Sequence, residues 1–81
     1  MLEKGITLMP NPATNYVDVL VSDNDINIQE LQVYDVYGKL LQTIKVNSNP
    51  TRIDISNLAS GMYMVRILGD NGIANKSFIK K

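Results

Sequence analysis

The stretch that decides the fold reads Ile53-Asp54-Ile55-Ser56-Asn57-Leu58-Ala59-Ser60-Gly61-Met62-Tyr63-Met64-Val65-Arg66-Ile67. Its first half is rich in the small polar residues and glycine that form turns. Its second half alternates, and Tyr63, Val65 and Ile67 fall on one face of an extended chain. Arg66 falls on the opposite face. The stretch therefore predicts a turn that leads directly into a half-buried β-strand at residues 62–68.

The same alternation recurs in short segments along the rest of the chain. Polar residues, glycine or proline separate these segments at a spacing of about eight to twelve residues, which is typical of an all-β sandwich. The predicted strands are residues 6–9, 16–21, 28–36, 39–46, 52–55, 62–68 and 73–79. No window carries a convincing helical period. Because such short strands cannot bury one open sheet, we expect six or seven strands in two packed sheets, with no helix.

Turn residues interrupt the strands at defined places. Pro10 and Pro12 cannot belong to a central strand, because each lacks the N–H that a ladder requires. Gly38 supplies the positive φ of a tight hairpin, and Asp70-Asn71-Gly72 has the residues expected of a second hairpin turn. These two hairpins are the strand pairs that the sequence alone defines.

The composition excludes several kinds of chemistry. The 81 residues allow one domain, and 44% of them are hydrophobic, which is ordinary for a globular protein. The chain has no cysteine and no histidine, so a disulfide framework, a thiolate metal site and a Ser-His-Asp triad are ruled out. The sequence predicts a protein that is not an enzyme and that binds no cofactor and no metal.

The charge balance and hydropathy limit the partners. Eight basic and eight acidic residues cancel, so the chain lacks the basic surplus that nucleic-acid binding requires. No apolar run reaches the roughly 20 residues that a membrane-spanning helix needs. We therefore expect no nucleic-acid partner and no direct membrane span.

Two features could be ligand sites, and each has a simpler structural interpretation. Asp23-Asn24-Asp25 offers oxygen ligands, but calcium takes about six or more and no partner segment is evident, which favours a solvated turn. Tyr34 and Tyr37 flank a hairpin and could stack on a sugar, whereas Tyr63 is expected in the core. A carbohydrate-binding or adhesin-type β-sandwich module is therefore the alternative function.

Four segments, taken together in this order and spacing, resemble the type A C-terminal sorting domain of the type IX secretion system, in the Por secretion system family. They are Met9-Pro10-Asn11-Pro12-Ala13-Thr14-Asn15, Val33-Tyr34-Asp35-Val36-Tyr37-Gly38-Lys39-Leu40-Leu41, Ile55-Ser56-Asn57-Leu58-Ala59-Ser60-Gly61-Met62-Tyr63-Met64-Val65 and Lys76-Ser77-Phe78-Ile79-Lys80-Lys81. The resemblance covers residues 6–81. It implies an immunoglobulin-like β-sandwich of about seven antiparallel strands, which agrees with the strands predicted above.

The resemblance implies a non-catalytic sorting signal. Such domains direct an attached cargo protein across the outer membrane of Gram-negative, Bacteroidetes-type bacteria. The cargo passes through the periplasm and is then held at the cell surface or secreted. The implied partners are the outer-membrane translocon, a shuttle protein and a sortase-like cysteine protease. This protease normally removes the domain and can join the cargo to an anionic lipopolysaccharide.

The positions that match the family motifs are Pro10, Asn11, Pro12, Gly38, Gly61, Tyr63, Lys80 and Lys81. The prolines are expected to fix a rigid lead-in to the domain, the glycines to permit tight turns, and the tyrosine to pack the penultimate strand. Most of these positions should therefore determine the fold. The two lysines should instead contact a partner, because a chain end contributes little to a core.

The resemblance also divides the chain. Residues 1–5 are interpreted as a linker remnant or a start added for expression, and residues 6–81 as the sorting domain. The cleavage site and the cargo are then expected to lie outside the sequence. Since a terminal strand with unpaired backbone groups can add to a neighbouring sheet, an edge-strand dimer is also expected.

Overall fold

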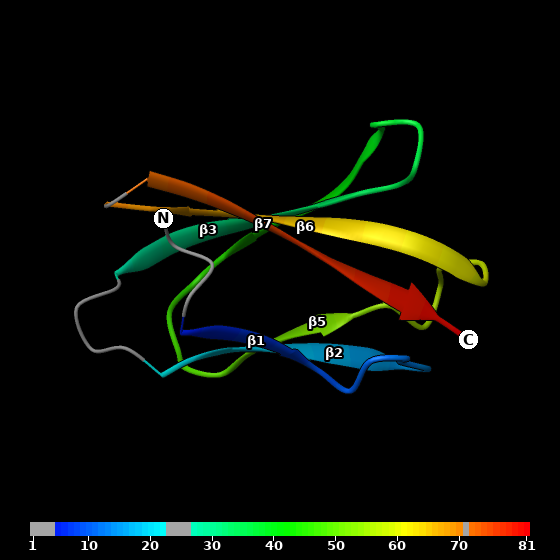
Figure 1. The fold of residues 1–81 in the computed structure, drawn as a ribbon, viewed down its shortest axis with the longest axis horizontal. Coiled ribbons are helices and arrows are strands. Elements are labelled where there is room, and N and C mark those ends of the chain that lie inside the picture. The colour runs from blue at the N-terminus through cyan, green and yellow to red at the C-terminus, as the bar shows by residue number, and fades with distance from the viewer. Residues whose placement is uncertain (1–4, 23–26, 71) are drawn as a thin grey trace.

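The computed structural model describes residues 5–22, 27–70 and 72–81, which form seven strands and no helix (Figure 1). The strands are β1 (Ile6–Met9), β2 (Tyr16–Val21), β3 (Ile28–Tyr34), β4 (Leu40–Lys45), β5 (Thr51–Asp54), β6 (Gly61–Gly69) and β7 (Gly72–Lys80). The described residues accordingly contain no helix long and apolar enough to cross a membrane.

The strands form two antiparallel sheets that pack face to face. One sheet has three strands in the order β1-β2-β5, and the other has four in the order β4-β3-β6-β7. Figure 1 shows them as two layers, with β1, β2 and β5 below β3, β6 and β7. The longest pairing joins β6 to β7, from Gly61 opposite Lys80 to Gly69 opposite Gly72. The predicted all-β sandwich is therefore confirmed.

The core lies between the sheets and consists of alternate residues along each strand. In β6, Tyr63, Val65 and Ile67 are buried and Arg66 faces outward, as the alternation predicts. A fully buried aliphatic side chain contributes about 1.5–3 kcal/mol relative to an exposed one. The other buried hydrophobic residues are Ile6, Ala13, Val17, Val19, Ile28, Leu31, Val33, Ile53, Ile55, Ala74 and Phe78.

The observed strands differ from the predicted ones at their ends. β1 and β2 have the predicted bounds, whereas β3 ends at Tyr34 rather than Val36 because Asp35 begins a tight turn there. β6 and β7 are longer than predicted because their pairing continues up to Gly69 and Gly72. The predicted turn between them includes Asn71, which lies outside the described residues.

Candidate recognition site

The loops that carry the motif positions lie at one end of the sandwich. Strands β1, β3, β5 and β7 run toward this end, and β2, β4 and β6 begin there. The pairings within each sheet are antiparallel, and the parallel bridge of Ala13 with Lys80 relates the two sheets. Figure 1 shows the β1–β2, β3–β4 and β5–β6 connections and the last residue on the same side. We call this region, made of residues 10–15, 35–39, 55–61 and 79–81, the motif end.

A short bridge joins the β1–β2 connection to β7 at the motif end. The N–H of Ala13 donates to the carbonyl of Ile79 at 2.7 Å, and the carbonyl of Ala13 accepts from the N–H of Lys81 at 2.8 Å. The Oδ1 atom of Asn11 accepts from the N–H of Ile79 at 3.0 Å. Ala13 is fully buried. Residues 11–13 therefore form a parallel partner for the end of β7 and lie beside Lys80.

Pro10 and Pro12 flank Asn11 and are exposed. Neither proline can donate a backbone hydrogen bond, so the contacts to β7 come from the Asn11 side chain and the Ala13 backbone. The pyrrolidine rings also restrict φ, which lowers the entropy lost when the segment is held in place. The two prolines thus stiffen the bridge and leave their own rings accessible to a partner.

Tyr63 connects the core to the loop between β5 and β6. It is 8% exposed and stacks on Phe78, with ring centroids 5.6 Å apart and 23° between the ring planes. Its hydroxyl donates to the carbonyl of Ala59 at 2.6 Å. Gly61, which lies between Ala59 and the ring, has φ of 153°, a conformation that L side chains rarely adopt. Tyr63 and Gly61 therefore shape this loop.

Lys80 and Lys81 have different surroundings. Lys80 is half-buried, and its Nζ atom donates to the carbonyl of Leu58 at 2.9 Å. Lys81 is exposed, and its backbone N–H is the group that bonds Ala13. The sequence did not indicate that Lys80 also supports the fold, because its loop partner comes from a segment 22 positions away.

Gly38 lies in the β3–β4 hairpin with φ of 83°, in the left-handed region that favours glycine. Asp35 holds this hairpin with four hydrogen bonds. Its Oδ1 atom accepts from the N–H groups of Tyr37 and Lys39 at 2.9 Å each. Its carbonyl accepts from the N–H of Gly38, and its own N–H donates to the carbonyl of Lys39, both at 3.1 Å. The hairpin is therefore a rigid turn.

The outer face of the three-stranded sheet carries an ion pair that the sequence analysis missed. Arg52 Nε donates to Asp18 Oδ1 at 2.8 Å, and its Nη2 donates to Asp18 Oδ2 at 3.0 Å. The guanidinium also lies 3.7 Å from the ring centroid of Tyr16. These hydrogen bonds lower the pKa of Asp18 and raise the pKa of Arg52. Only the register between β2 and β5 places these residues opposite each other.

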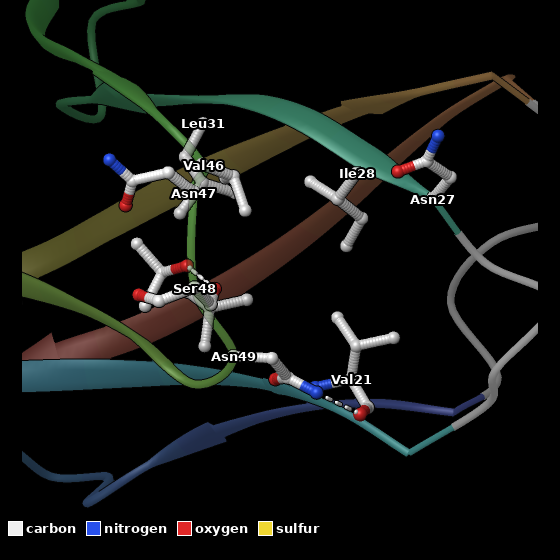
Figure 2. Close-up of a pocket in the computed structure, with 10 residues that line it drawn as sticks. Val21, Asn27, Ile28, Leu31, Val46, Asn47, Ser48 and Asn49 are labelled. Carbon is white, nitrogen blue, oxygen red and sulfur yellow. Dashed lines mark hydrogen bonds between the residues drawn. The ribbon is translucent and has the colours of Figure 1, made fainter.

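A cavity of about 440 Å³ opens at the other end of the sandwich, and Figure 2 shows the residues that line it. The amide of Asn49 bonds both backbone groups of Val21: Oδ1 accepts from the N–H at 3.0 Å, and Nδ2 donates to the carbonyl at 2.7 Å. Thr51 Oγ1 donates to the carbonyl of Ser48 at 2.8 Å. These polar groups complete the ladder and the turn of the protein itself, so the cavity offers little for ligand recognition.

No group of three or more candidate metal-ligating side chains occurs within residues 5–22, 27–70 and 72–81. The sequence feature considered for calcium, Asp23-Asn24-Asp25, lies outside the described residues.

A comparison with protein families identifies a match that covers nearly the whole chain. The family described as "Secretion system C-terminal sorting domain" matches residues 7–81. The matched region includes each of the positions from Pro10 to Lys81 that the sequence motifs single out. No curated protein matches the chain.

Proposed function

The chain belongs to the family of secretion system C-terminal sorting domains, and from that premise we propose that it delivers an attached cargo protein through the type IX secretion system by being recognised as a folded unit. Domains of this family are sorting signals that interact with the secretion machinery. They lead to export to the cell surface or the medium, and they are generally non-catalytic.

The bridge between residues 11–13 and β7 is the observation that supports recognition of a folded unit. Asn11 and Ala13 contact Ile79 and Lys81 through three hydrogen bonds of 2.7–3.0 Å. Motif residues from the N-terminal and C-terminal parts of the sequence thereby form one surface. An unfolded chain could not present them together, so a partner that reads both motifs requires the folded sandwich.

The surroundings of the motif positions suggest two groups with different roles. Tyr63 is buried, and Gly61 and Gly38 have positive φ, so we assign these three residues to the fold. The exposed side chains of Pro10, Pro12 and Lys81 are assigned to partner contact. Asn11 and Lys80 belong to both groups, because each makes a hydrogen bond that holds the motif end together.

The finer steps of the proposal are those that the resemblance of the sequence to this family implies. The cargo passes through the periplasm, and a shuttle protein and the outer-membrane translocon engage the domain. A sortase-like cysteine protease then cuts before the domain and can join the cargo to an anionic lipopolysaccharide. We assign residues 6–81 to the sorting domain and residues 1–5 to a linker remnant or a start added for expression, with the cleavage site expected outside the sequence.

The alternative, a carbohydrate-binding or adhesin module, lacks a supporting aromatic platform among the described residues. Of the two candidate tyrosines, Tyr34 lies in β3 and Tyr37 lies at the exposed hairpin tip, outside the strands. Tyr16 lies on the other sheet, so these tyrosines form no row along one sheet face. The rings of Tyr16 and Tyr34 each also have an arginine near them, with guanidinium-to-centroid distances of 3.7 Å for Arg52 and 5.6 Å for Arg66. A glycan array probed with the 81-residue chain would revive the alternative if it gave specific binding.

The edge-strand dimer stays a prediction, and the structure suggests where the added strand would lie. A hollow of about 480 Å³ separates β1 from β7 and is lined by residues of both strands, including Leu8 and Ser77. The backbone N–H and C=O groups of successive residues point toward alternate edges of a strand. Those of Ser77 therefore point toward the same edge as those of Ile79. The half-buried Lys76 next to it would disfavour pairing, as inward-pointing charges do at edge strands. Light scattering that shows only monomer at high concentration would refute the dimer.

The sorting function can be tested by attaching residues 1–81 to the C-terminus of a periplasmic reporter. The host is a bacterium with a type IX system, and the measured quantity is the fraction of reporter at the surface and in the medium. We expect export with the unaltered domain and periplasmic retention after deletion of residues 76–81.

Two controls make this test specific. A host that lacks the outer-membrane translocon should retain the reporter in the periplasm. The deletion must also be compared with an intact domain carrying Asn47→Ala, an exposed position at the other end of the sandwich, which should leave export unchanged. Normal surface delivery after deletion of residues 76–81 would contradict the proposal.

A further inference from the structure

Apolar side chains gather on the outer face of the four-stranded sheet at the motif end. They share this face because Met62 lies opposite Ile79, and Tyr34 lies opposite both Leu40 and Met64. Exposed apolar clusters commonly mark interaction sites. The exposed members, which we call the hairpin patch, are Val36, Tyr37, Leu40, Met62, Met64 and Ile79.

The tip of the β3–β4 hairpin is the most prominent part of this patch. Tyr37 is 92% exposed and Val36 is 64% exposed, so neither side chain contributes to the core. The four hydrogen bonds of Asp35 nevertheless fix the backbone that carries them. A rigidly held aromatic residue loses little entropy on binding and is well suited to anchor a partner.

A small hollow lies at the base of the hairpin and complements this protruding tip. Its volume is about 160 Å³, and its walls include Val36, Gly38, Met62 and Met64. A water molecule occupies about 30 Å³ in the liquid, so the hollow can take one apolar side chain of a partner. The methionines give this wall a soft and adaptable surface, as they do at other recognition sites.

The apolar character stops at the next cross-strand row. There, Arg66 of β6 lies opposite Gln32 of β3 and Asn75 of β7, so the row is polar. The one carboxylate that borders the hollow, in the part of the chain that the structure describes, is that of Asp35, which already binds two backbone N–H groups. The patch is therefore an uncharged area with a polar border, and it fits an uncharged apolar partner surface.

We propose that the hairpin patch is a docking surface for a protein of the secretion machinery, which inserts one apolar side chain into the hollow while Tyr37 and Val36 pack around it. The inference rests on the proposed sorting function. Its location supports it, since Ile79 belongs to the patch and also bonds Asn11 and Ala13 of the motif bridge. A partner that covers the motif end would meet both surfaces.

The size and charge of the patch favour a protein of the secretion machinery over two other possible occupants, a second copy of this chain and an anionic lipid surface. A stable dimer usually buries about 800 Å² from roughly 20–30 residues on each side, far more than this patch offers. An anionic lipid surface is usually bound by clusters of about four to eight basic residues. The exposed cations that adjoin the patch in the described chain are Lys39, Arg66 and Lys81, fewer than such a cluster contains. A transient protein contact fits the patch best, because a transported domain has to be released again.

The test compares patch variants with a matched control in the reporter assay. The variants are the double substitution Val36→Ser/Tyr37→Ser and the single substitution Met62→Ser. The control is Ile73→Ser, since Ile73 lies outside the patch and its exposure of 53% matches the 54% of Met62. We expect the exported fraction to fall about tenfold for the patch variants, the loss typical of one anchor, and to stay unchanged for the control.

A further variant and a melting curve distinguish a loss of docking from a loss of folding. Ser77→Trp fills the hollow from an exposed strand position and removes no core contact. It should lower export as the double variant does, while the melting temperature of the isolated chain stays within about 2 °C, well under the shift that 1 kcal/mol produces. Normal export of Ser77→Trp and of the double variant would overturn the inference.

Two further measurements test whether a lipid surface or a second copy of this chain occupies the patch instead. The chain is mixed with vesicles of phosphatidylethanolamine and phosphatidylglycerol, and flotation that Val36→Ser/Tyr37→Ser abolishes would overturn the inference in favour of lipid. A dimer in light scattering that the same double variant abolishes would overturn it in favour of a second copy. Retention of the reporter by the unaltered domain would instead refute the proposed sorting function.

Discussion

The side chain of Asn11 accepts a hydrogen bond of 3.0 Å from the backbone N–H of Ile79, across 68 positions of sequence. This contact belongs to the bridge in which Ala13 bonds Ile79 and Lys81. The bridge ties the three-stranded sheet to the edge of the four-stranded one. The order of the motif end therefore depends on residues that the sequence places far apart.

Replacing Asn11 with alanine should destabilise the domain. The Ile79 N–H loses its acceptor, and a typical hydrogen bond contributes about 1 kcal/mol to stability. For a domain of this size, that loss lowers the melting temperature by about 4–8 °C. Circular dichroism during heating would measure it, with the exposed Asn57→Ala as the matched control. Equal melting temperatures for the two variants would show that the Asn11 bond adds nothing.

Replacing Tyr63 with phenylalanine should separate the hydroxyl from the ring. The stacking on Phe78 is retained, but the 2.6 Å hydrogen bond to Ala59 is lost, which should cost about 1 kcal/mol. Tyr63→Ala removes the ring as well, and the loss of a buried aromatic side chain costs about 3–5 kcal/mol. Urea unfolding would measure both variants. Tyr37→Phe serves as the control and should leave stability unchanged, since Tyr37 is 92% exposed.

The Asp18–Arg52 pair should make stability depend on pH in the acid range. Because the hydrogen bonds of Arg52 lower the pKa of Asp18 below its ordinary value of 3.8, the carboxylate stabilises the folded state at neutral pH. This stabilisation is fully present above the unfolded pKa and is lost as the pH falls below 3.8 and through the lowered folded pKa. The effect should be small, since an exposed arginine side chain is well screened by solvent.

Unfolding by urea, which is uncharged and does not screen the pair, would measure this effect at pH 7 and pH 2. Asp18→Asn should reduce the difference in stability between the two pH values, and Arg52→Gln should reduce it in the same way. Asp54 also contributes, because hydrogen bonds from Ser56 lower its pKa, so Asp54→Asn provides a reference for a carboxylate without the ion pair. An unchanged pH dependence in Asp18→Asn would contradict the assignment to this pair.

Replacing Lys80 with methionine should distinguish a structural from a contact role. Methionine keeps the apolar stem but loses the Nζ hydrogen bond to the Leu58 carbonyl, so we expect a loss of about 1 kcal/mol. Lys81→Met should leave stability unchanged, because Lys81 is exposed and bonds through its backbone. Reporter export measures the other role. If Lys81 contacts the machinery, Lys81→Met lowers export without lowering the melting temperature.

Much of the strand pattern could be predicted because alternation is a local property. The burial of Tyr63, Val65 and Ile67 follows from their spacing, and the hairpin at Gly38 follows from the turn residues beside it. The strand ends were less accurate. The turn around Asp35 depends on side-chain hydrogen bonds to the backbone that compete with continued strand pairing.

The sequence could not predict in the same way that the motif residues lie together at one end of the sandwich. Pairing between strands distant in sequence depends on how the two sheets pack, so neither the Ala13 bridge nor the contact of Lys80 with Leu58 has a local signal. The Asp18–Arg52 pair depends on the register between β2 and β5 for the same reason. The family resemblance singled out the motif positions, but it did not show that they share one end of the fold.

The parallel direction of the Ala13 bridge has a mechanical consequence. Residues 11–13 and the end of β7 run in the same direction and are linked by three hydrogen bonds. A pulling force that acts backward on Asn11 and forward on Lys81 is directed along the strands, so it loads these bonds together in shear. Resistance to such a force is set by the unfolding rate rather than by the equilibrium stability. A domain held at its C-terminus and pulled through its cargo would thus load the bridge where its motifs meet, together with the β1–β2 pairing that precedes it.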